Sequence, residues 1–285
     1  MTKPNTKKNI DELITLALKE DIDKGDITTN IFVPSNMTSK AYMITHEKAT
    51  VAGFEVVKRV FKRLDRRAVV RSFFKDGDTV NKNTRLIEIK GKTRALLTGE
   101  RVALNFLSHL SAVATNTTTF IKKVHPLKIQ IVDTRKTTPG FRLLEKQAVR
   151  CAKGINHRLN LHEMILIKDN HHLISHLSIT DMIKKARNKT TKPVGIEVEN
   201  IRDFKEAWEA KPDLILLDNM SLAEIKEAVL FLKKNSLPRQ PIVEISGGVN
   251  LENIRSAANT GIKRISIGAL THSKKTINIS MEIMI

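Results

Sequence analysis

The second half of the chain alternates short apolar segments with helical segments, and this alternation constrains the fold more than any other feature. The apolar segments are uniformly hydrophobic, as expected for strands buried on both faces of a parallel sheet. We expect these strands at 129–132, 164–167, 194–198, 214–217, 242–245 and 264–267. Helices are expected near 144–150, 179–187, 201–209, 222–233 and 251–259. Repeated units of this kind predict a parallel α/β sheet that closes towards a barrel.

The first half has a different pattern. A short amphipathic helix is expected at 10–19, followed by an acidic turn over 20–29 that contains Gly25. Strands are expected at 41–45, 68–74 and 85–89, with a helix over 56–64 and a turn at 75–78. A long helix over 96–114 is expected to bridge two domains. This half therefore predicts an α+β domain.

Polar and glycine residues gather at the ends of the predicted parallel strands. The carboxyl ends of such strands form the active-site face of a barrel, and the last two loops commonly hold phosphate. The segments concerned are 133–136, 168–170, Glu197, 218–219, 246–248 and 268–269. We therefore expect the chemistry of the protein at this edge of the sheet.

Basic residues are dense between positions 133 and 171. Arginine recognises carboxylates in a planar, bidentate manner, whereas lysine serves as a compact charge for phosphate. The basic residues next to strand ends are expected to bind a small polyanion, and they are Arg135, Lys136, Arg158 and Lys168. Those on the following helix either do the same or face solvent, and they are Arg142, Lys146 and Arg150.

Two carboxylates interrupt successive apolar strands. Glu197 and Asp218 need a cation or a set of hydroxyl groups, because a buried charge is costly without a partner. Ribose hydroxyls and a magnesium ion carried on a pyrophosphate would suit them, and pairing with a neighbouring Lys or Arg is the alternative. Ser246-Gly247-Gly248 and Gly268 offer backbone N–H groups for phosphate.

The formal net charge of +19 and pI near 10 make nucleic acid a candidate partner. Aromatic residues amount to only 4%, and lysine is spread along the whole chain, so nucleic-acid binding is not expected.

The single Cys151 excludes an internal disulfide, which favours a cytoplasmic protein. Residues 1–9 are polar and basic, and no apolar run has membrane-spanning length, so we expect a soluble protein without a membrane partner.

The segments at these strand ends also resemble a known family. The stretch 133–150, followed by Asn156-His157-Arg158 and 166–171, is similar to the signature of the quinolinate phosphoribosyltransferase family, also called nicotinate-nucleotide pyrophosphorylase (carboxylating). Further similarity covers 20–29, 99–107, 217–220, 244–248 and 267–272, which is nearly the whole chain. The resemblance implies an N-terminal open sandwich over 1–108 with an antiparallel sheet, joined by the tail 276–285, and an incomplete α/β barrel over 109–275.

The resemblance also implies an activity. Such an enzyme is a type II phosphoribosyltransferase, a glycosyltransferase that converts quinolinate and phosphoribosyl pyrophosphate to nicotinate mononucleotide, pyrophosphate and carbon dioxide in NAD biosynthesis. Substrate-borne Mg²⁺ is the implied cofactor. A homodimer with shared active sites is the implied assembly, and a higher assembly is left open.

Residue roles follow by position from the resemblance. Quinolinate carboxylates would be bound by Arg135, His157, Arg158 and, from the partner subunit, by the residue equivalent to Arg101. Lys136 and Lys168 would meet anionic groups of both substrates, and Glu197 and Asp218 would face ribose and magnesium. The remaining substrate-binding residues would be Thr134, Ser246, Gly247, Gly248, Gly268, Ala269, Leu270 and His272.

Some positions depart from the family pattern. The chain has Gly195-Ile-Glu-Val-Glu199 where a further glutamate is frequent, so the role is assigned to Glu197. Ala152-Lys153-Gly154 replaces a glycine run, and His162-Glu163 is also unusual, which concerns the shape of the loop more than the chemistry.

Other functions compete with the quinolinate assignment. They are a paralogue of the same fold, such as the molybdenum-locus protein, a phosphoribosyltransferase for nicotinate, and a basic nucleic-acid-binding protein with a vestigial barrel. The arginine and histidine set expected around the substrate suits a dicarboxylate better than a monocarboxylate, and therefore favours quinolinate.

Overall fold

The computed structural model describes residues 6–235 and 239–284. They form two compact units. The first contains residues 6–118, 138–153 and 274–284, and the second contains residues 119–137, 154–235 and 239–273. The first five residues of the predicted polar N-terminal segment lie outside the described part. Within that part, no helix is long and apolar enough to cross a membrane.

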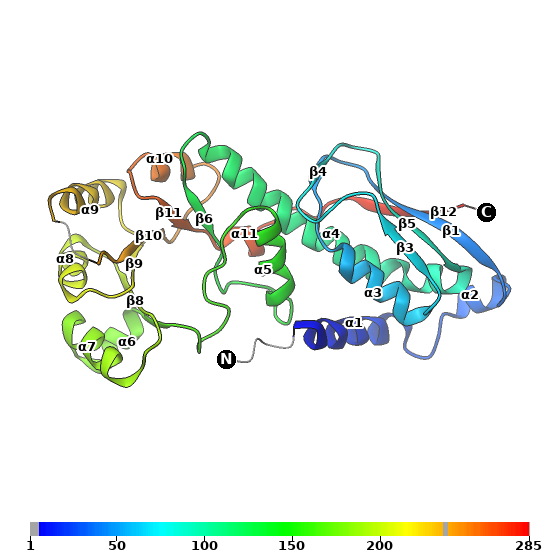
Figure 1. The fold of residues 1–285 in the computed structure, drawn as a ribbon, viewed down its shortest axis with the longest axis horizontal. Helices are drawn as coiled ribbons and strands as arrows, with labels where there is room; N and C mark the ends of the chain where they lie inside the picture. Colours follow the sequence, from blue (N-terminus) through cyan, green and yellow to red (C-terminus); the bar gives the residue numbers. More distant parts are fainter. Residues whose placement is uncertain (1–5, 236–238, 285) are drawn as a thin grey trace. The chain divides into compact units, whose positions relative to one another are not determined.

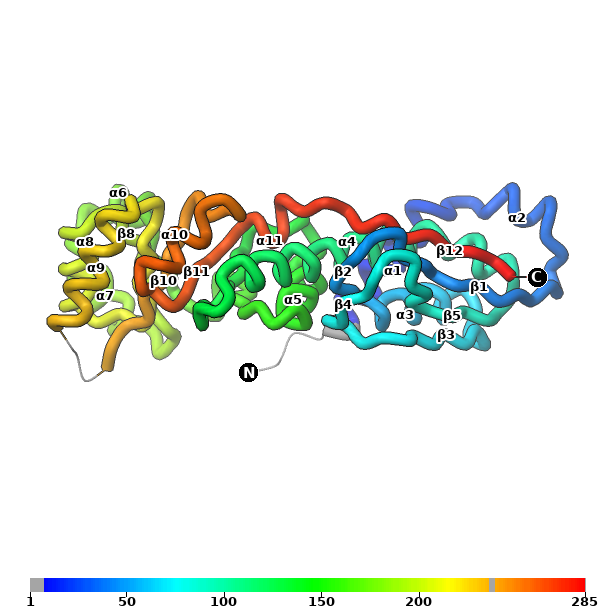
Figure 2. The backbone as a smooth tube through the Cα atoms, turned by 90° about the horizontal axis from the view of Figure 1, so that it is seen from above, coloured from blue at the N-terminus to red at the C-terminus, as the bar shows by residue number. Residues whose placement is uncertain are grey.

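The first unit is built on an antiparallel sheet. Its strands are β1 (Thr38–Thr45), β3 (Val69–Ser72), β5 (Thr84–Lys92) and β12 (Ile279–Met284), in the order β12-β1-β5-β3. The C-terminal strand β12 runs beside β1, as the red and blue segments in Figure 2 show. Ile283 pairs with Ala41. A smaller sheet pairs β2 (Ala49–Thr50) with β4 (Thr79–Val80). The predicted α+β class and the return of the tail to this sheet are confirmed.

The helices of this unit are α1 (Thr6–Ile22), α2 (Ile27–Phe32), α3 (Phe54–Leu64), α4 (Thr93–Val124) and α5 (Arg142–Cys151), and the last residues of α4 belong to the second unit. The turn expected over 20–29 is confined to residues 23–26, because 20–22 belong to α1 and 27–29 belong to α2. Asp26 caps α2, because its side chain accepts a hydrogen bond from the Thr29 N–H at 2.9 Å. Gly99 lets α4 approach α3 closely, since a Cβ there would lie 2.7 Å from Leu64 Cδ1.

The second unit contains a six-stranded parallel sheet in the order β6-β11-β10-β9-β8-β7. The strands are β6 (Gln130–Val132), β7 (Ile165–Ile167), β8 (Val194–Val198), β9 (Leu214–Asp218), β10 (Ile242–Ser246) and β11 (Arg264–Ser266). Strands β6 and β7 end this order without pairing with each other among the described residues. The predicted incomplete α/β barrel is therefore confirmed.

Helices α7 (Ile179–Lys189), α8 (Ile201–Ala210) and α9 (Leu222–Lys234) lie along the outer side of the strands β8 to β10 (Figure 1). Buried Phe204, Ala207 and Trp208 form the inner face of α8. Two short helices were not expected, α6 (Asp169–Ser175) and α11 (Ala269–His272), and α10 (Ile254–Ala258) is shorter than the predicted 251–259. The strand register sets Ser246 beside Asp218 and Glu197 beside Leu216, so the functional strand ends meet at one edge.

Candidate active site

A cavity of about 790 Å³ lies at the carboxyl ends of the parallel strands. Most of the residues expected to bind substrate line it, and they are Thr134, Arg135, Lys136, His157, Arg158, Lys168, Glu197, Asp218, Ser246, Gly247, Gly248, Gly268, Ala269 and His272. Most of these come from the ends of the six strands or the loops that follow them, whereas His157 and Arg158 come from the segment between α5 and β7. Residues expected to carry the chemistry therefore line one cavity at this edge of the sheet.

Two expected residues lie elsewhere. Leu270 is fully buried and does not line the cavity. Arg101 is exposed on α4 in the first unit.

The basic residues of α5 differ from one another. Arg150 is exposed, as expected if this helix faces solvent, whereas Lys146 is buried.

The cavity also has walls that the sequence patterns did not single out. Leu166 and Leu216 give it an apolar side and belong to a small buried cluster with Leu214. Asn219 and Asn250 add amide groups near the glycine loop. Both leucines occupy the middle of predicted strands, where hydrophobicity alone does not distinguish a cavity wall from the core.

One wall of the cavity is cationic. Arg158 donates from Nη1 to the Met164 carbonyl at 2.8 Å, while its buried Nε has no hydrogen-bond partner among the described residues. Burial lowers the pKa of Arg158, and the nearby charge of Arg135 lowers it further. Because the two guanidinium groups repel each other, a bound anion would stabilise both.

A buried carboxylate holds the turn that carries this wall. Asp133 is fully buried, and it accepts hydrogen bonds from Asn156 Nδ2 at 2.6 Å and from the His157 N–H at 2.7 Å. The Arg158 N–H in turn donates to His157 Nδ1 at 2.8 Å. The sequence marks Asp133 only as the first polar residue after a strand, and its contacts to the turn at 156–157 require the folded structure.

Another part of the cavity lining carries the two carboxylates. Lys168 Nζ lies 2.7 Å from Glu197 Oε1, so the expected alternative of pairing with a lysine occurs inside the cavity. Burial raises the pKa of Glu197 above its usual value, the Lys168 ammonium opposes this shift, and the charge of Asp218 adds to it. Asp218 also accepts a hydrogen bond from Asn219 Nδ2 at 3.1 Å.

A glycine loop completes the site between β10 and α10. Gly247 and Gly248 have φ values of +83° and +62°, which favour glycine, and a Cβ on Gly247 would overlap Asn219. Asn253 Nδ2 donates to the Gly248 carbonyl at 2.9 Å and fixes the far side of the loop. A loop of this shape presents backbone N–H groups, which suits a phosphate.

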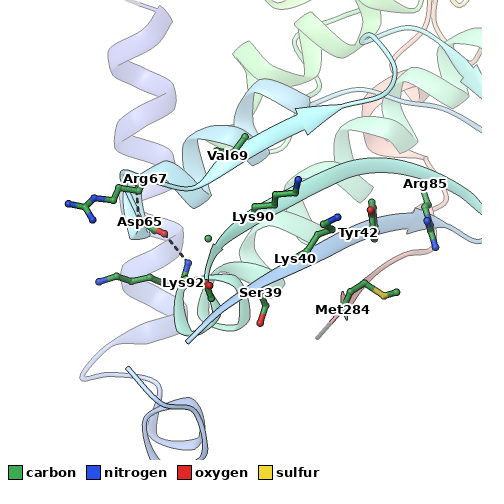
Figure 3. A pocket seen from close by; sticks show the side chains of 12 residues that line it. Ser39, Lys40, Tyr42, Asp65, Arg67, Val69, Arg85, Lys90, Lys92 and Met284 are labelled. Carbon is green, nitrogen blue, oxygen red and sulfur yellow. Dashed lines mark hydrogen bonds between the residues drawn. The ribbon is translucent and has the colours of Figure 1, made fainter. Parts of the chain in front are cut away.

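The first unit has a separate cavity of about 740 Å³ on the outer face of its sheet (Figure 3). Lys40, Lys90 and Arg85 extend from β1 and β5, and Arg85 stacks over the Tyr42 ring at 4.4 Å. Asp65 is engaged by the backbone N–H groups of Arg67 and Lys92. None of the residues expected to bind substrate lines this cavity, so it is not the candidate active site.

A parallel α/β sheet with cations, carboxylates and a glycine loop at its carboxyl edge defines an enzyme for a phosphorylated, anionic substrate. Family models confirm and sharpen this class. The C-terminal domain model of quinolinate phosphoribosyl transferase matches residues 113–282, and the N-terminal domain model matches residues 26–111. The chain belongs to the quinolinate phosphoribosyl transferase family.

Individual relatives agree with this assignment. A probable nicotinate-nucleotide pyrophosphorylase (carboxylating) of Bacillus subtilis is 39% identical, over 93% of this chain and 90% of the relative. One from Methanocaldococcus jannaschii is 35% identical, over 96% of both chains. The solved nicotinate-nucleotide pyrophosphorylase of Francisella tularensis superposes with a TM-score of 0.90 at 35% identity, covering 99% of this chain and 98% of that one.

Proposed function

We propose that the protein joins quinolinate to phosphoribosyl pyrophosphate and releases pyrophosphate and carbon dioxide, with nicotinate mononucleotide as the product. The observation that carries this proposal is the cavity of the second unit, whose lining brings together two arginines, a lysine–carboxylate pair and a glycine loop. A dicarboxylate ring and a phosphorylated sugar need these surfaces together. The names of the relatives, which are 35% and 39% identical to this chain, support the same activity.

The pyridine dicarboxylate fits the arginine wall. Arg135 and Arg158 carry the planar donors that bind carboxylates in pairs, and both line the cavity. Leu166 and Leu216 provide an apolar surface for the ring. In this arrangement the substrate charge compensates two guanidinium groups that otherwise repel each other.

The phosphorylated sugar fits the rest of the cavity. The loop 246–248 would bind the 5-phosphate through backbone N–H groups, and Lys136 and Lys168 would bind the pyrophosphate. Glu197 and Asp218 would accept hydrogen bonds from the ribose hydroxyls. This leaves the anomeric carbon of the sugar between the two walls.

Magnesium would enter on the pyrophosphate. Among the described residues, no group of three or more His, Cys, Asp or Glu side chains could hold a metal ion, and the cavity offers the pair Glu197 and Asp218. Two carboxylates that interact electrostatically suit an ion that keeps its waters and substrate oxygens as its other ligands. When bound, the ion would neutralise charge on the pyrophosphate.

The reaction follows from these positions. The pyridine nitrogen forms a bond to the anomeric carbon as the bond from that carbon to the pyrophosphate oxygen breaks. Lys136 and Lys168 stabilise the leaving group, and Glu197 and Asp218 stabilise positive charge on the ribose. The positively charged ring nitrogen then stabilises the electron pair that stays on the adjacent ring carbon when the 2-carboxylate departs as carbon dioxide, and a proton from water binds that carbon.

The proposed assembly is a homodimer in the cytoplasm. Arg101 is exposed on α4 and outside the cavity lining, which suits a residue that reaches the active site of a partner subunit. The lone Cys151 is consistent with a reducing compartment.

The test compares two ring substrates. Purified protein is incubated with phosphoribosyl pyrophosphate, Mg²⁺ and either quinolinate or nicotinate, and products are identified by mass spectrometry. We expect nicotinate mononucleotide from quinolinate and at least ~100-fold slower formation from nicotinate, since a monocarboxylate leaves one arginine unpaired. Faster turnover of nicotinate would assign the protein to the competing nicotinate activity.

A further inference from the structure

Lys136 lies against the start of α11, where it meets Gly268 and Thr271, within the second unit. Its carbonyl oxygen accepts a hydrogen bond from Thr271 Oγ1 at 2.5 Å. Its own N–H donates to Thr134 Oγ1 at 3.1 Å. Thr271 is fully buried and does not line the cavity, so its hydroxyl is placed to act on Lys136 rather than on a substrate.

The side chain of Lys136 passes close to Gly268, the N-cap of the same helix. A Cβ on Gly268 would lie 3.0 Å from Lys136 Cδ and 3.0 Å from His272 Nε2. Gly268 has φ −64° and ψ −35°, which any L residue adopts, so glycine is not needed there for the backbone conformation. The missing side chain instead leaves room for the lysine stem to cross the turn.

From these two contacts we infer that Thr271 and Gly268 form a seat that positions Lys136, with Thr271 as a positioning residue for the reaction. The inference rests on the proposed function, in which Lys136 binds the leaving pyrophosphate. The Thr271 hydroxyl also lies 3.1 Å from the Gly268 carbonyl, so a purely local role in closing the turn is the competing explanation. The two explanations differ in whether the effect of the hydroxyl depends on Lys136.

Kinetics of a double-mutant cycle separate them. Thr271→Val removes the hydroxyl at nearly constant volume, and we expect it to lower kcat at least ~10-fold, while Thr271→Ser stays within ~3-fold of the wild type. In a Lys136→Ala background, Thr271→Val should change the residual turnover less than ~2-fold, because the carbonyl at position 136 remains but the ammonium group that it positions is already removed. Gly268→Ala is a second variant with the same expected loss and no backbone strain.

Thr260→Val is the matched control. Thr260 is buried in the same unit, and its hydroxyl donates to the Ala257 carbonyl at 2.7 Å, but it lies outside the cavity lining. We expect its turnover to stay within ~3-fold of the wild type. An equal loss in the two valine variants, or an undiminished effect of Thr271→Val in the Lys136→Ala background, would overturn the inference.

Hydrogen exchange tests the seat without turnover. Thr271→Val should speed amide exchange in a peptide covering 134–138 at least ~5-fold, whereas Thr271→Ser and Thr260→Val should leave it unchanged. Unchanged exchange in Thr271→Val overturns the seat. If the wild type makes no nicotinate mononucleotide, the proposed function fails while this measurement still decides whether Thr271 holds the loop.

Discussion

Lys168 and Glu197 form an ion pair in which each side chain affects the other. Burial raises the pKa of the Glu197 carboxyl, and the 2.7 Å contact with the Lys168 ammonium opposes that rise. The same contact holds the ammonium group at the cavity wall. The two residues therefore behave as one unit, and either is expected to fail without the other.

Lys168→Ala should lower turnover at least ~100-fold, because it removes a charge from the leaving-group site and leaves Glu197 without its cation. Adding Glu197→Gln should cost much less than the product of the two single losses. Steady-state kinetics measure both effects, with Lys184→Ala, exposed on α7, as the control. Near-normal turnover of Lys168→Ala would contradict its role.

At the scale of elements, α5 is anchored by one buried carboxylate. Glu145 is fully buried and lies 2.7 Å from His109 Nε2 on α4 and 3.5 Å from Lys274 Nζ. It also accepts hydrogen bonds from the N–H and the hydroxyl of Thr138, at 3.1 and 2.9 Å. Burial raises its pKa, but these partners outweigh burial and hold the pKa of Glu145 below its usual value of 4.5.

Glu145→Gln should therefore lower the free energy of unfolding at pH 7 by about 2 kcal/mol, from lost charge-assisted hydrogen bonds. A lowered carboxyl pKa gives stability that is present above the usual value and is lost as pH falls through the lowered one. Urea unfolding should show the wild-type advantage shrinking below pH 4.5. Glu55→Gln, which breaks only the exposed 3.0 Å pair with Arg59, should cost less than ~1 kcal/mol, and an equal cost would contradict the anchor.

The glycine loop after β10 allows a sharper prediction. Gly247→Ala introduces a Cβ that overlaps Asn219 at a φ of +83°, so the loop must move. We expect KM for phosphoribosyl pyrophosphate to rise at least ~10-fold. Gly140→Ala is the control, since its φ is +79° and its Cβ would meet no atom within 4 Å. An equal rise in this KM in both variants would show that backbone strain, and not phosphate contact, causes the rise.

The sequence predicted elements well where periodicity decided them. The strand at 194–198 was predicted with its observed bounds, and α3 and α8 were displaced by at most two residues. Helices α6 and α11 were missed, because they are too short to show a period and α6 has no buried residue. The cavity residues after strands were predictable by position, whereas Asp133 and Thr271 act through contacts with distant segments that only the fold brings together.

At the scale of the whole molecule, the proposed homodimer makes a prediction about mixing. If Arg101 acts in the partner's site, Arg101→Ala and Lys136→Ala chains should form heterodimers with one intact site and one doubly damaged site. Mixing the two inactive proteins under conditions that exchange subunits should then restore part of the activity. A silent mixture, with exchange confirmed by mass spectrometry of tagged chains, would refute the shared site.

One cavity is proposed to join the ring to the sugar and to remove a carboxylate. A single reaction tests this directly when it starts from quinolinate labelled in its 2-carboxylate and the carbon dioxide, pyrophosphate and nicotinate mononucleotide formed are all counted. We expect equal amounts of all three, and at least ~100-fold less of each with Lys136→Ala. Nucleotide that keeps the labelled carboxylate, or carbon dioxide released without pyrophosphate, would contradict it.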